Sequence, residues 1–318
     1  MQGNFVNTMK KIAAVIFPFL LAASCDIRSG HVVLDEKCSG PLVTDETFDE
    51  ADRPGLEYDD TGDYFLVRPW NYEKDRNASR KYPLLIYLHG ASQEGYLKNL
   101  YYMGMGYYSP TDTDGDYSAE YRKDIADKFR KTYPCFAFVP QGPGGWNTGT
   151  LIAQIEQLKA DYRIDPDRIY IHGFSMGGSA IYPLAEAYYE YNGQLFAGMI
   201  RLNGYSPVSL GDEIVANTSV WVMVGLGDSR SVIDNIREAY AFLKDHDFNS
   251  GAFRSERSGY IVGEAPYEHR ADSVGLMKGG VRFALKTEYP DDGHFITEFP
   301  FRDPHVFEWL FCQSVGNR

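Results

Sequence analysis

The chain has 318 residues, of which 44% are hydrophobic and 24% charged, and its formal net charge is −13. This length and balance suit one large α/β domain or two small ones, with a sizeable core. The negative charge argues against a nucleic-acid partner, because phosphate binding needs a basic patch. Aromatic residues reach 15%, which fits aromatic surfaces that hold sugars or rings as well as ordinary packing.

The first 24 residues are expected to form an export signal. Lys10 and Lys11 precede an apolar run over residues 12–21, and small residues then lead to Cys25. This order is typical of a secretory signal peptide, and the run is too short to span a bilayer comfortably. The ending Ala-Ala-Ser-Cys resembles a bacterial lipoprotein signal, in which Cys25 is lipidated and becomes the mature N-terminus. We therefore expect an exported protein, anchored to the cell envelope in the periplasm or at the outer-membrane surface. Its membrane contact would be the lipid on Cys25 alone, and plain secretion is the alternative.

Residues 25–60 are polar and acidic and are expected to form a tether, followed by one α/β domain over residues 61–318. Short apolar runs rich in β-branched and aromatic residues predict buried strands. They lie at 64–67, 84–88, 136–139, 169–171, 196–200, 220–224 and 281–285. Helical patterns lie between them, at 119–131, 150–162, 176–189, 232–245 and 304–313. This alternation predicts βαβ units and a mostly parallel central sheet with helices on both faces.

Two connections are longer than usual for a compact domain, at 91–118 and 249–280. We expect both to be lids or binding loops. The first contains an acidic run at 112–116, in which Gly115 comes before the third Asp, whereas a calcium-binding EF-hand loop has it after. A solvated acidic turn is therefore predicted there instead of a calcium site.

Three cysteines remain outside the signal, namely Cys38, Cys135 and Cys312. In an oxidising compartment two of them can pair, which gives three possible pairings and leaves one thiol. The sequence does not choose among the pairings. No two of these cysteines lie within metal-ligand spacing, so no metal is expected.

The sequence Gly-Phe-Ser-Met-Gly at 173–177 is a G-x-S-x-G motif between a predicted strand and a predicted helix. In this context it is the nucleophile elbow of α/β-hydrolases, in which a sharp turn holds Ser175 out at the top of the sheet. Glycines flank the serine because a Cβ at either position would collide with a neighbouring strand or helix. The helix N-terminus also favours negative charge beside Ser175. A glycine-rich turn without chemistry, or a phosphate-binding loop, is the alternative.

The partners of Ser175 are expected in the order Ser, Asp, His. Asp228 directly follows the predicted strand at 220–224, at the sheet edge where active-site residues belong. It can also be read as a helix N-cap, and Asp212 is the competing acid. His294 follows the last predicted strand and is the expected base.

Other histidines are assigned to structure. His172 lies within the strand before the elbow and is expected to be a hydrogen-bonded core residue, and His89 follows the strand at 84–88. The loop after His89 supplies one backbone N–H to the oxyanion hole of this fold, and the residue after the nucleophile supplies the other. We therefore expect Met176 as one donor and Ala91 or Ser92 as the second.

Candidate substrate-binding residues are aromatic or carry an amide. Gln141 and Trp146 follow the predicted strand at 136–139, so Trp146 is expected at the carboxyl edge of the sheet. With Tyr101 and Tyr102 of the first long loop, these residues are expected to wall a pocket for a sugar ring or an aryl acyl group. A plain core tryptophan is the alternative for Trp146.

Several segments together resemble one group of secreted esterases. They are Tyr-Leu-His-Gly at 87–90, Val-Pro-Gln at 139–141, the run at 165–170 that enters the elbow, Gly-His at 293–294 and the closing helix at 303–311. The group includes bacterial feruloyl and acetyl-xylan esterases of carbohydrate esterase family 1 and polyhydroxyalkanoate depolymerases. This chain differs from many of them in the Phe-Ile-Thr sequence after His294 and in a longer loop at 91–118.

The resemblance implies an α/β-hydrolase domain with a Ser175, Asp228 and His294 triad and no cofactor. It further implies hydrolysis of carboxylic esters, either small esters or feruloyl or acetyl groups on plant-type polysaccharide. Two other functions stay open. One is a serine peptidase of the prolyl-oligopeptidase kind, although the chain has too little sequence before the domain for a propeller. The other is a non-catalytic, lipid-anchored glycan-binding protein, which the intact triad residues disfavour.

Overall fold

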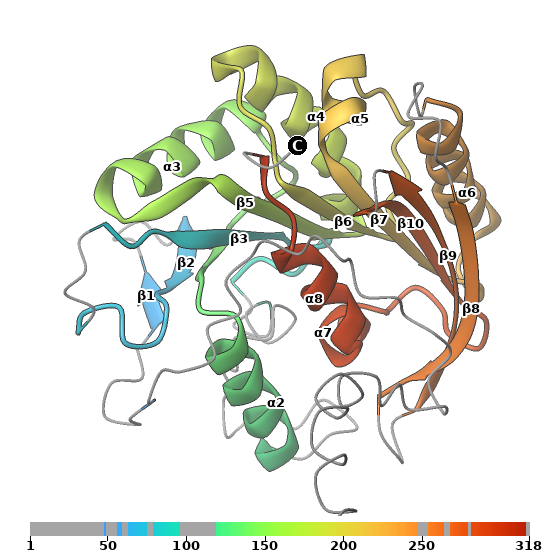
Figure 1. The fold of residues 1–318 in the computed structure, drawn as a ribbon, viewed down its shortest axis with the longest axis horizontal. Coiled ribbons are helices and arrows are strands. Elements are labelled where there is room, and N and C mark those ends of the chain that lie inside the picture. Colours follow the sequence, from blue (N-terminus) through green and yellow to red (C-terminus); the bar gives the residue numbers. More distant parts are fainter. Residues whose placement is uncertain are drawn as a thin grey trace, which may run out of the picture.

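The computed structural model describes residues 48, 56–58, 63–74, 79–95, 99, 119–246, 254–263, 268–278 and 281–315. The signal segment with Cys25, the acidic run at 112–116, and Tyr101 and Tyr102 lie outside the described residues. The described chain forms one ten-stranded sheet in the order β1-β2-β4-β3-β5-β6-β7-β10-β9-β8, with helices on both faces (Figure 1). This is the α/β-hydrolase architecture that the sequence predicts.

The strands are β1 (Leu56–Tyr58), β2 (Tyr64–Val67), β3 (Tyr82–Leu88), β4 (Phe136–Pro140), β5 (Ile164–Phe174), β6 (Gly198–Leu202), β7 (Ser219–Gly225), β8 (Arg254–Val262), β9 (His269–Lys278) and β10 (Val281–Tyr289). The helices are α2 (Ala119–Thr132), α3 (Thr148–Asp161), α4 (Met176–Asn192), α5 (Asp212–Asn217), α6 (Arg230–Asp245), α7 (Phe299–Arg302) and α8 (Pro304–Phe311). Every strand and helix that the sequence predicts is present, with ends that move by a few residues.

The centre of the sheet is parallel from β4 through β3, β5, β6 and β7 to β10, and both margins are antiparallel. All seven residues of β3 and of β7 are buried. Strands covered by helices on both faces need apolar side chains on both, which explains the continuous apolar runs in the sequence.

Two hydrophobic layers lie on the two faces of the sheet. On β3, Leu84 and Ile86 point into the layer under α3, α4, α5 and α6, whereas Leu85 and Tyr87 point into the layer with α2, α7 and α8. This alternation follows from the two-residue repeat of a strand. Figure 1 shows the first set of helices above the sheet and the second set below it.

The segment at 249–280 is not the long loop that the sequence analysis predicts. Residues 254–262 and 269–278 form β8 and β9, an antiparallel pair that extends the sheet beyond β10. Their sequences are rich in Ser and Arg and lack the longer apolar runs of strands such as β3 and β7. Here buried and exposed residues alternate along the strand: Tyr260 and Val262 are buried, whereas Ile261 is exposed. The prediction was wrong because it relied on continuous hydrophobicity.

The N-terminal margin also departs from expectation. Leu56–Tyr58 forms β1, which pairs with β2 in antiparallel fashion. The predicted tether to residue 60 was therefore wrong for these three residues. Within the part of the chain that the structure describes, no helix is both long enough and apolar enough to cross a membrane.

The cysteines are partly assigned by the structure. Cys135 is a free and buried thiol, whose burial raises its pKa. Cys312 is disulfide-bonded, to a residue outside the described ranges. Both pairings that involve Cys135 are therefore excluded.

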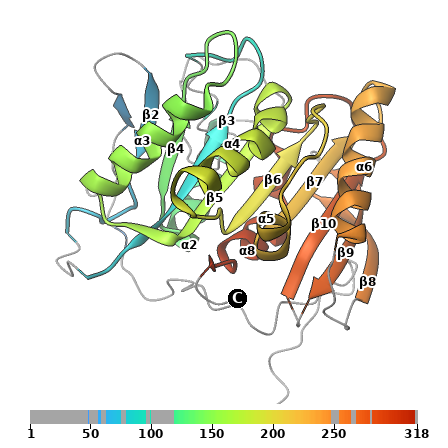
Figure 2. The same cartoon turned by 90° about the horizontal axis from the view of Figure 1, so that it is seen from above.

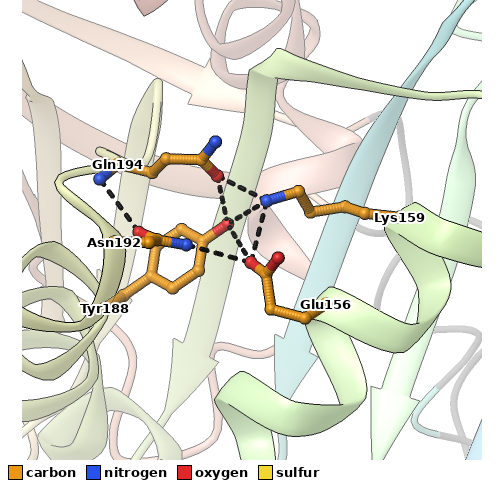
Figure 3. Close-up of polar contacts among 5 residues, drawn as sticks. All are labelled: Glu156, Lys159, Tyr188, Asn192 and Gln194. Carbon is orange, nitrogen blue, oxygen red and sulfur yellow. Dashed lines mark hydrogen bonds and ion pairs between the residues drawn. The ribbon is translucent and has the colours of Figure 1, made fainter.

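A polar cluster joins the C-terminal ends of α3 and α4, and we call it the α3–α4 clamp. It consists of Glu156, Lys159, Tyr188, Asn192 and Gln194 (Figure 3). The Lys159 ammonium donates to Glu156 Oε1 (2.8 Å), to the Tyr188 hydroxyl (3.2 Å) and to Gln194 Oε1 (2.5 Å). Burial, together with the nearby Glu156 carboxylate, raises the pKa of Tyr188, so its phenol stays neutral.

Candidate active site

The nucleophile elbow has the strained geometry expected of it. Ser175 stands between the end of β5 and the start of α4 with φ 53° and ψ −111°, outside the regions that non-glycine residues normally adopt. A Cβ on Gly173 would lie 2.6 Å from Gly177 O, and one on Gly177 would lie 1.9 Å from Leu88 O. Glycine is therefore required at both positions, because β3, β5 and α4 meet there backbone to backbone.

The structure brings Ser175, His294 and Asp228 together. His294 Nε2 lies 3.0 Å from Ser175 Oγ, and His294 Nδ1 lies 2.6 Å from Asp228 Oδ2. Ser175 follows the carboxyl end of β5, Asp228 that of β7 and His294 that of β10. These strands are parallel and lie in the order β5-β6-β7-β10, so their carboxyl ends meet at one edge of the sheet. The His294 side chain is 34% exposed and the Asp228 side chain only 8%. The chain of hydrogen bonds therefore runs from a buried carboxylate to an accessible hydroxyl.

The Asp228 carboxylate is held as an anion. Burial alone would raise its pKa, but hydrogen bonds from Asn203 and His294 and from the Ser229 backbone outweigh burial and lower the pKa. Oδ1 accepts from the Ser229 N–H (2.6 Å), and Oδ2 accepts from Asn203 Nδ2 (2.5 Å). The competing acid Asp212 is exposed at the start of α5, and the imidazole bonds to Asp228 instead.

The acid and base loops are joined through their backbones. The Gly227 N–H donates to Asp292 O (2.8 Å), and the Leu226 N–H donates to Tyr289 O (2.9 Å). A Cβ on Gly225 would lie 2.0 Å from Gly293 O. The segments that carry Asp228 and His294 thus pack directly against each other.

The loop after β3 is fixed against the elbow. Gly90 N–H donates to Gln93 Oε1 (2.7 Å), and a Cβ on Gly90 would lie 2.9 Å from the Phe174 ring. Ala91 and Ser92, the predicted oxyanion donors, are exposed within this turn, and Ser92 has φ 60°. On the other side Met176 begins α4, so no preceding helical turn can accept its N–H.

Gln141 supports this loop. Its Oε1 accepts from the Gly95 N–H (2.6 Å) and its Nε2 donates to Val139 O (3.1 Å). Both ends of the amide are thus engaged within the protein. Gln141 is placed to hold the loop that contains Ala91 and Ser92, and a direct contact with substrate stays a prediction.

Trp146 lies beside the same loop. Its half-buried ring packs on the His89 imidazole, with ring centres 4.7 Å apart. His89 is fully buried, its Nδ1 bonds to Gly90 O (2.8 Å), and its Nε2 accepts from the Gly142 N–H (3.2 Å). Burial lowers the pKa of His89, so the ring is a neutral structural element, as the sequence predicts. A contact between Trp146 and substrate stays a prediction.

His172 differs in one respect from the expectation. It is fully buried in the core, where its ring centre lies 5.0 Å from that of Tyr87. Among the described residues, however, neither ring nitrogen has a hydrogen-bond partner. Burial lowers the pKa of His172 to about 3. The prediction of a hydrogen-bonded core histidine was right about burial and wrong about the bonds.

Two residues near the site were missed by the sequence analysis. Asn203, at the end of β6, bonds to Asp228 and lies far from every motif. Phe295 is 76% exposed, and its ring centre lies 5.6 Å from that of His294 and 6.0 Å from that of Phe174. Its position directly after the predicted base was the signal that could have identified it.

The parallel sheet, the elbow after β5 and the Ser–Asp–His order along the chain define a serine hydrolase of the α/β-hydrolase fold. No protein-family model and no curated protein matches this sequence.

Solved structures with similar folds include several esterases. A ferulic acid esterase is 15% identical over 78% of this chain and 90% of its own, with a TM-score of 0.48. An acetyl xylan esterase from Aspergillus awamori is 14% identical over 81% of this chain and 99% of its own, with a TM-score of 0.49. An arylesterase is 10% identical over 86% of this chain and 87% of its own, with a TM-score of 0.47. Similarity at this level does not identify a substrate.

Proposed function

We propose that this protein is a serine esterase that hydrolyses carboxylic esters. The observation that carries the proposal is the pair of hydrogen bonds from Ser175 Oγ to His294 Nε2 (3.0 Å) and from His294 Nδ1 to Asp228 Oδ2 (2.6 Å). Ser175 attacks the ester carbonyl, and His294 takes its proton and gives it to the departing alcohol. Water, activated by the same imidazole, then releases the acid, while Asp228 holds the ring in the required tautomer.

The negative charge on the tetrahedral intermediate is accepted by backbone N–H groups. Met176 provides one donor and Ala91 or Ser92 the other, in the loop that Gln141 fixes through Gly95. The N-terminus of α4 adds a favourable partial positive charge at this place. Each part of this mechanism is performed by the chain itself, so no cofactor or metal is needed.

We further propose that the substrate is an acyl decoration, feruloyl or acetyl, on plant-type polysaccharide. The exposed ring of Phe295 beside His294 supports this substrate class, because aromatic faces pack well on sugar and aryl rings. Tyr205, 54% exposed, is attached to the first turn of α4 through its backbone N–H, which donates to Ser179 Oγ (2.9 Å). Trp146, Gln141, Tyr101 and Tyr102 are further candidates for substrate contact.

Hydrolysis of p-nitrophenyl acetate tests the esterase activity. Wild type is expected to turn it over and Ser175→Ala is not, whereas Ser209→Ala, a change at an exposed serine outside the triad, keeps the rate. Equal rates for wild type and Ser175→Ala would contradict the proposal. Turnover of aminoacyl anilides in preference to aryl esters would favour a serine peptidase. Polysaccharide binding without turnover would favour a glycan-binding protein.

The choice of acyl group is a separate measurement. We expect feruloyl or acetyl esters to exceed longer-chain esters in kcat/KM across a panel that differs in the acyl group alone. A clear preference for long acyl chains would contradict the polysaccharide assignment and leave the esterase mechanism intact.

We also propose that the protein is exported and anchored by a lipid on Cys25. The basic and apolar sequence before Cys25 supports this, and so does the disulfide at Cys312, since disulfides persist in oxidising compartments. Cys25→Ser is expected to move the protein from the membrane fraction to the soluble fraction. If the variant stayed with the membranes, the lipid anchor would be wrong.

A further inference from the structure

We propose that Asn203 is a positioning residue of the active site, whose side-chain amide fixes the Asp228 carboxylate in the orientation that faces His294. The inference rests on the proposed esterase function and adds a fourth residue to its machinery. Asn203 does not contact the reacting atoms, and it acts through Asp228 alone.

The first argument is its place in the sheet. β6 lies between β5, which carries Ser175, and β7, which precedes Asp228, and Figure 2 shows these strands side by side. The Ser175 N–H donates to Leu202 O (2.9 Å), and the next residue, Asn203, donates its own N–H to Met223 O (3.0 Å). The chain at the end of β6 is therefore bonded to the nucleophile on one side and to the strand of the acid on the other.

The second argument is the backbone conformation of Asn203. Its φ of 47° lies in the left-handed region, which Gly, Asn and Asp adopt more readily than most other residues. Of these three residues only Asn has a side chain that donates a hydrogen bond at neutral pH. Asn therefore suits a position that needs both a left-handed backbone and a side-chain hydrogen-bond donor.

The third argument is the way the carboxylate is held. Asp228 Oδ2 accepts both from Asn203 Nδ2 (2.5 Å) and from His294 Nδ1 (2.6 Å), while Oδ1 accepts from the Ser229 N–H (2.6 Å). Of these donors His294 is the residue to be positioned: its Nδ1–H stays on Asp228 while its Nε2 exchanges the proton with Ser175, so the orientation of the carboxylate must be set by the other two donors. Asn203 and Ser229 hold one oxygen each and prevent the carboxylate from rotating away.

The fourth argument is that the amide is a poor choice for stability alone. Asn203 is fully buried, and its Oδ1 has no hydrogen-bond partner among the residues that the structure describes. A buried unpaired carbonyl is unfavourable, and Gly, which suits the same left-handed backbone, would avoid it. The benefit that remains is the bond to Asp228.

Asn203 stands on a rigid support. The fully buried Arg201 donates from Nε to Gly178 O (3.0 Å) in the first turn of α4 and from a terminal nitrogen to Ser206 O (2.7 Å). These bonds fasten the segment after β6 to the nucleophile helix. Asn203 therefore lies on a segment that is hydrogen-bonded to the helix that follows Ser175.

Asn203→Gly is the sharpest variant, because it keeps the left-handed backbone and removes only the amide. We expect kcat on p-nitrophenyl acetate to fall by about 10- to 100-fold, the loss of one hydrogen bond to a charged group. KM should stay within about twofold, because the amide does not touch substrate. Asn71→Gly is the matched control, since Asn71 also has a positive φ (64°) but lies in the turn after β2. A kcat for Asn203→Gly equal to that of the control would overturn the inference.

Asn203→Asp covers the case in which the glycine variant does not fold. It keeps the shape of the side chain but replaces the amide donor by a carboxyl group, which can donate to Asp228 only while it is protonated. We therefore expect kcat to fall as pH rises and this added proton is lost, in contrast to the wild type. A folded Asn203→Asp that keeps the wild-type kcat and pH profile at alkaline pH would also contradict the inference.

A second readout is independent of turnover. The short bond between His294 and Asp228 should give a low-field proton NMR signal from the imidazole Nδ1–H. We expect this signal to shift or broaden in Asn203→Gly and to stay unchanged in Asn71→Gly. An unchanged signal in Asn203→Gly would overturn the positioning role. A wild type that hydrolyses no ester would instead contradict the proposed function, which keeps the two failures distinct.

Discussion

The two ends of α4 carry polar networks of opposite design. At its N-terminus, hydrogen bonds run in a line from Asn203 and Asp228 through His294 to the Ser175 hydroxyl. At its C-terminus, about 25 Å away by helix rise, the α3–α4 clamp closes on itself, with one ammonium shared among several acceptors (Figure 3).

The difference lies in where each network ends. In the clamp, Lys159 faces Glu156, and the hydroxyl of Tyr188 has two acceptors within reach of its single proton, Gln194 Oε1 (2.8 Å) and Glu156 Oε1 (3.2 Å). A closed and neutral network of this kind stabilises the packing of two helices. The line at the other end of α4 ends on a hydroxyl that substrate can approach, so it can pass on a proton. The α3–α4 clamp is therefore expected to contribute to stability, and the hydrogen bonds that end at Ser175 to catalysis.

The largest expected effect is at the open network. Asp228→Ala should lower kcat by about 10⁴-fold, because the triad acts as one unit. Its thermal stability should change little in comparison. Asp212→Ala, at the competing acid exposed on α5, is the control and should keep near-normal turnover. Near-normal turnover in Asp228→Ala together with a large loss in Asp212→Ala would move the acid to Asp212.

Breaking the closed network should reverse this pattern. Lys159→Met leaves the partly buried Glu156 without its cation, and we expect a loss of roughly 2 kcal/mol in the free energy of unfolding with kcat unchanged. Lys244→Met is the matched control, because both lysines lie in the last turn of a helix and Lys244 is exposed. Chemical denaturation would measure both variants. Equal losses for the two would show that the clamp contributes nothing beyond the helix-end charge.

The burial of His172 should make the stability of the fold sensitive to acid. The pKa of His172 is about 3 in the folded protein, against 6.5 for an exposed histidine. Between these two pH values the unfolded chain is protonated at His172 whereas the folded chain is not. Stability should therefore fall as pH drops from about 6.5 towards 3, with a slope of up to about 1.4 kcal/mol per pH unit from this group. His172→Phe should flatten that part of the stability curve. If the slope of the free energy of unfolding against pH were the same in His172→Phe and wild type, the acid sensitivity would arise from other groups.

The smallest effect is expected at the exposed rings. Phe295→Ala should lower kcat/KM for feruloyl esters by about fivefold relative to acetyl esters, the loss of one ring contact of about 1 kcal/mol. Tyr191→Ala is the control, since Tyr191 is an aromatic residue at the clamp end of α4 and is 65% exposed. If both variants lowered the feruloyl rate equally, the effect would not belong to the site.

The sequence predicted the central strands and the elbow because their signals are local. The continuous apolar runs of β3 and β7 follow from burial on both faces, and the glycines around Ser175 follow from backbone contact within a few residues. The antiparallel strands β8 and β9 at the C-terminal margin of the sheet carry a weaker signal, because buried and more exposed positions alternate along them and polar side chains are tolerated at the exposed positions.

Asn203 could not be predicted for a different reason. Its role depends on a left-handed backbone and on a carboxylate 25 positions further along the chain, and neither can be recognised from a single sequence. The Asp228 assignment needed only the end of an apolar strand. Positioning residues are therefore found from three-dimensional contacts, whereas catalytic candidates can be found from their place after strands.

The direct packing of the acid loop on the base loop determines how this site can open and close. The Gly227 N–H donates to the carbonyl of Asp292, two residues before His294, and Gly225 lies so close to Gly293 that no Cβ fits between them. We therefore expect Asp228 and His294 to move together. A displacement at this edge of the sheet should change the distance between Ser175 Oγ and His294 Nε2 before it changes the distance between His294 Nδ1 and Asp228.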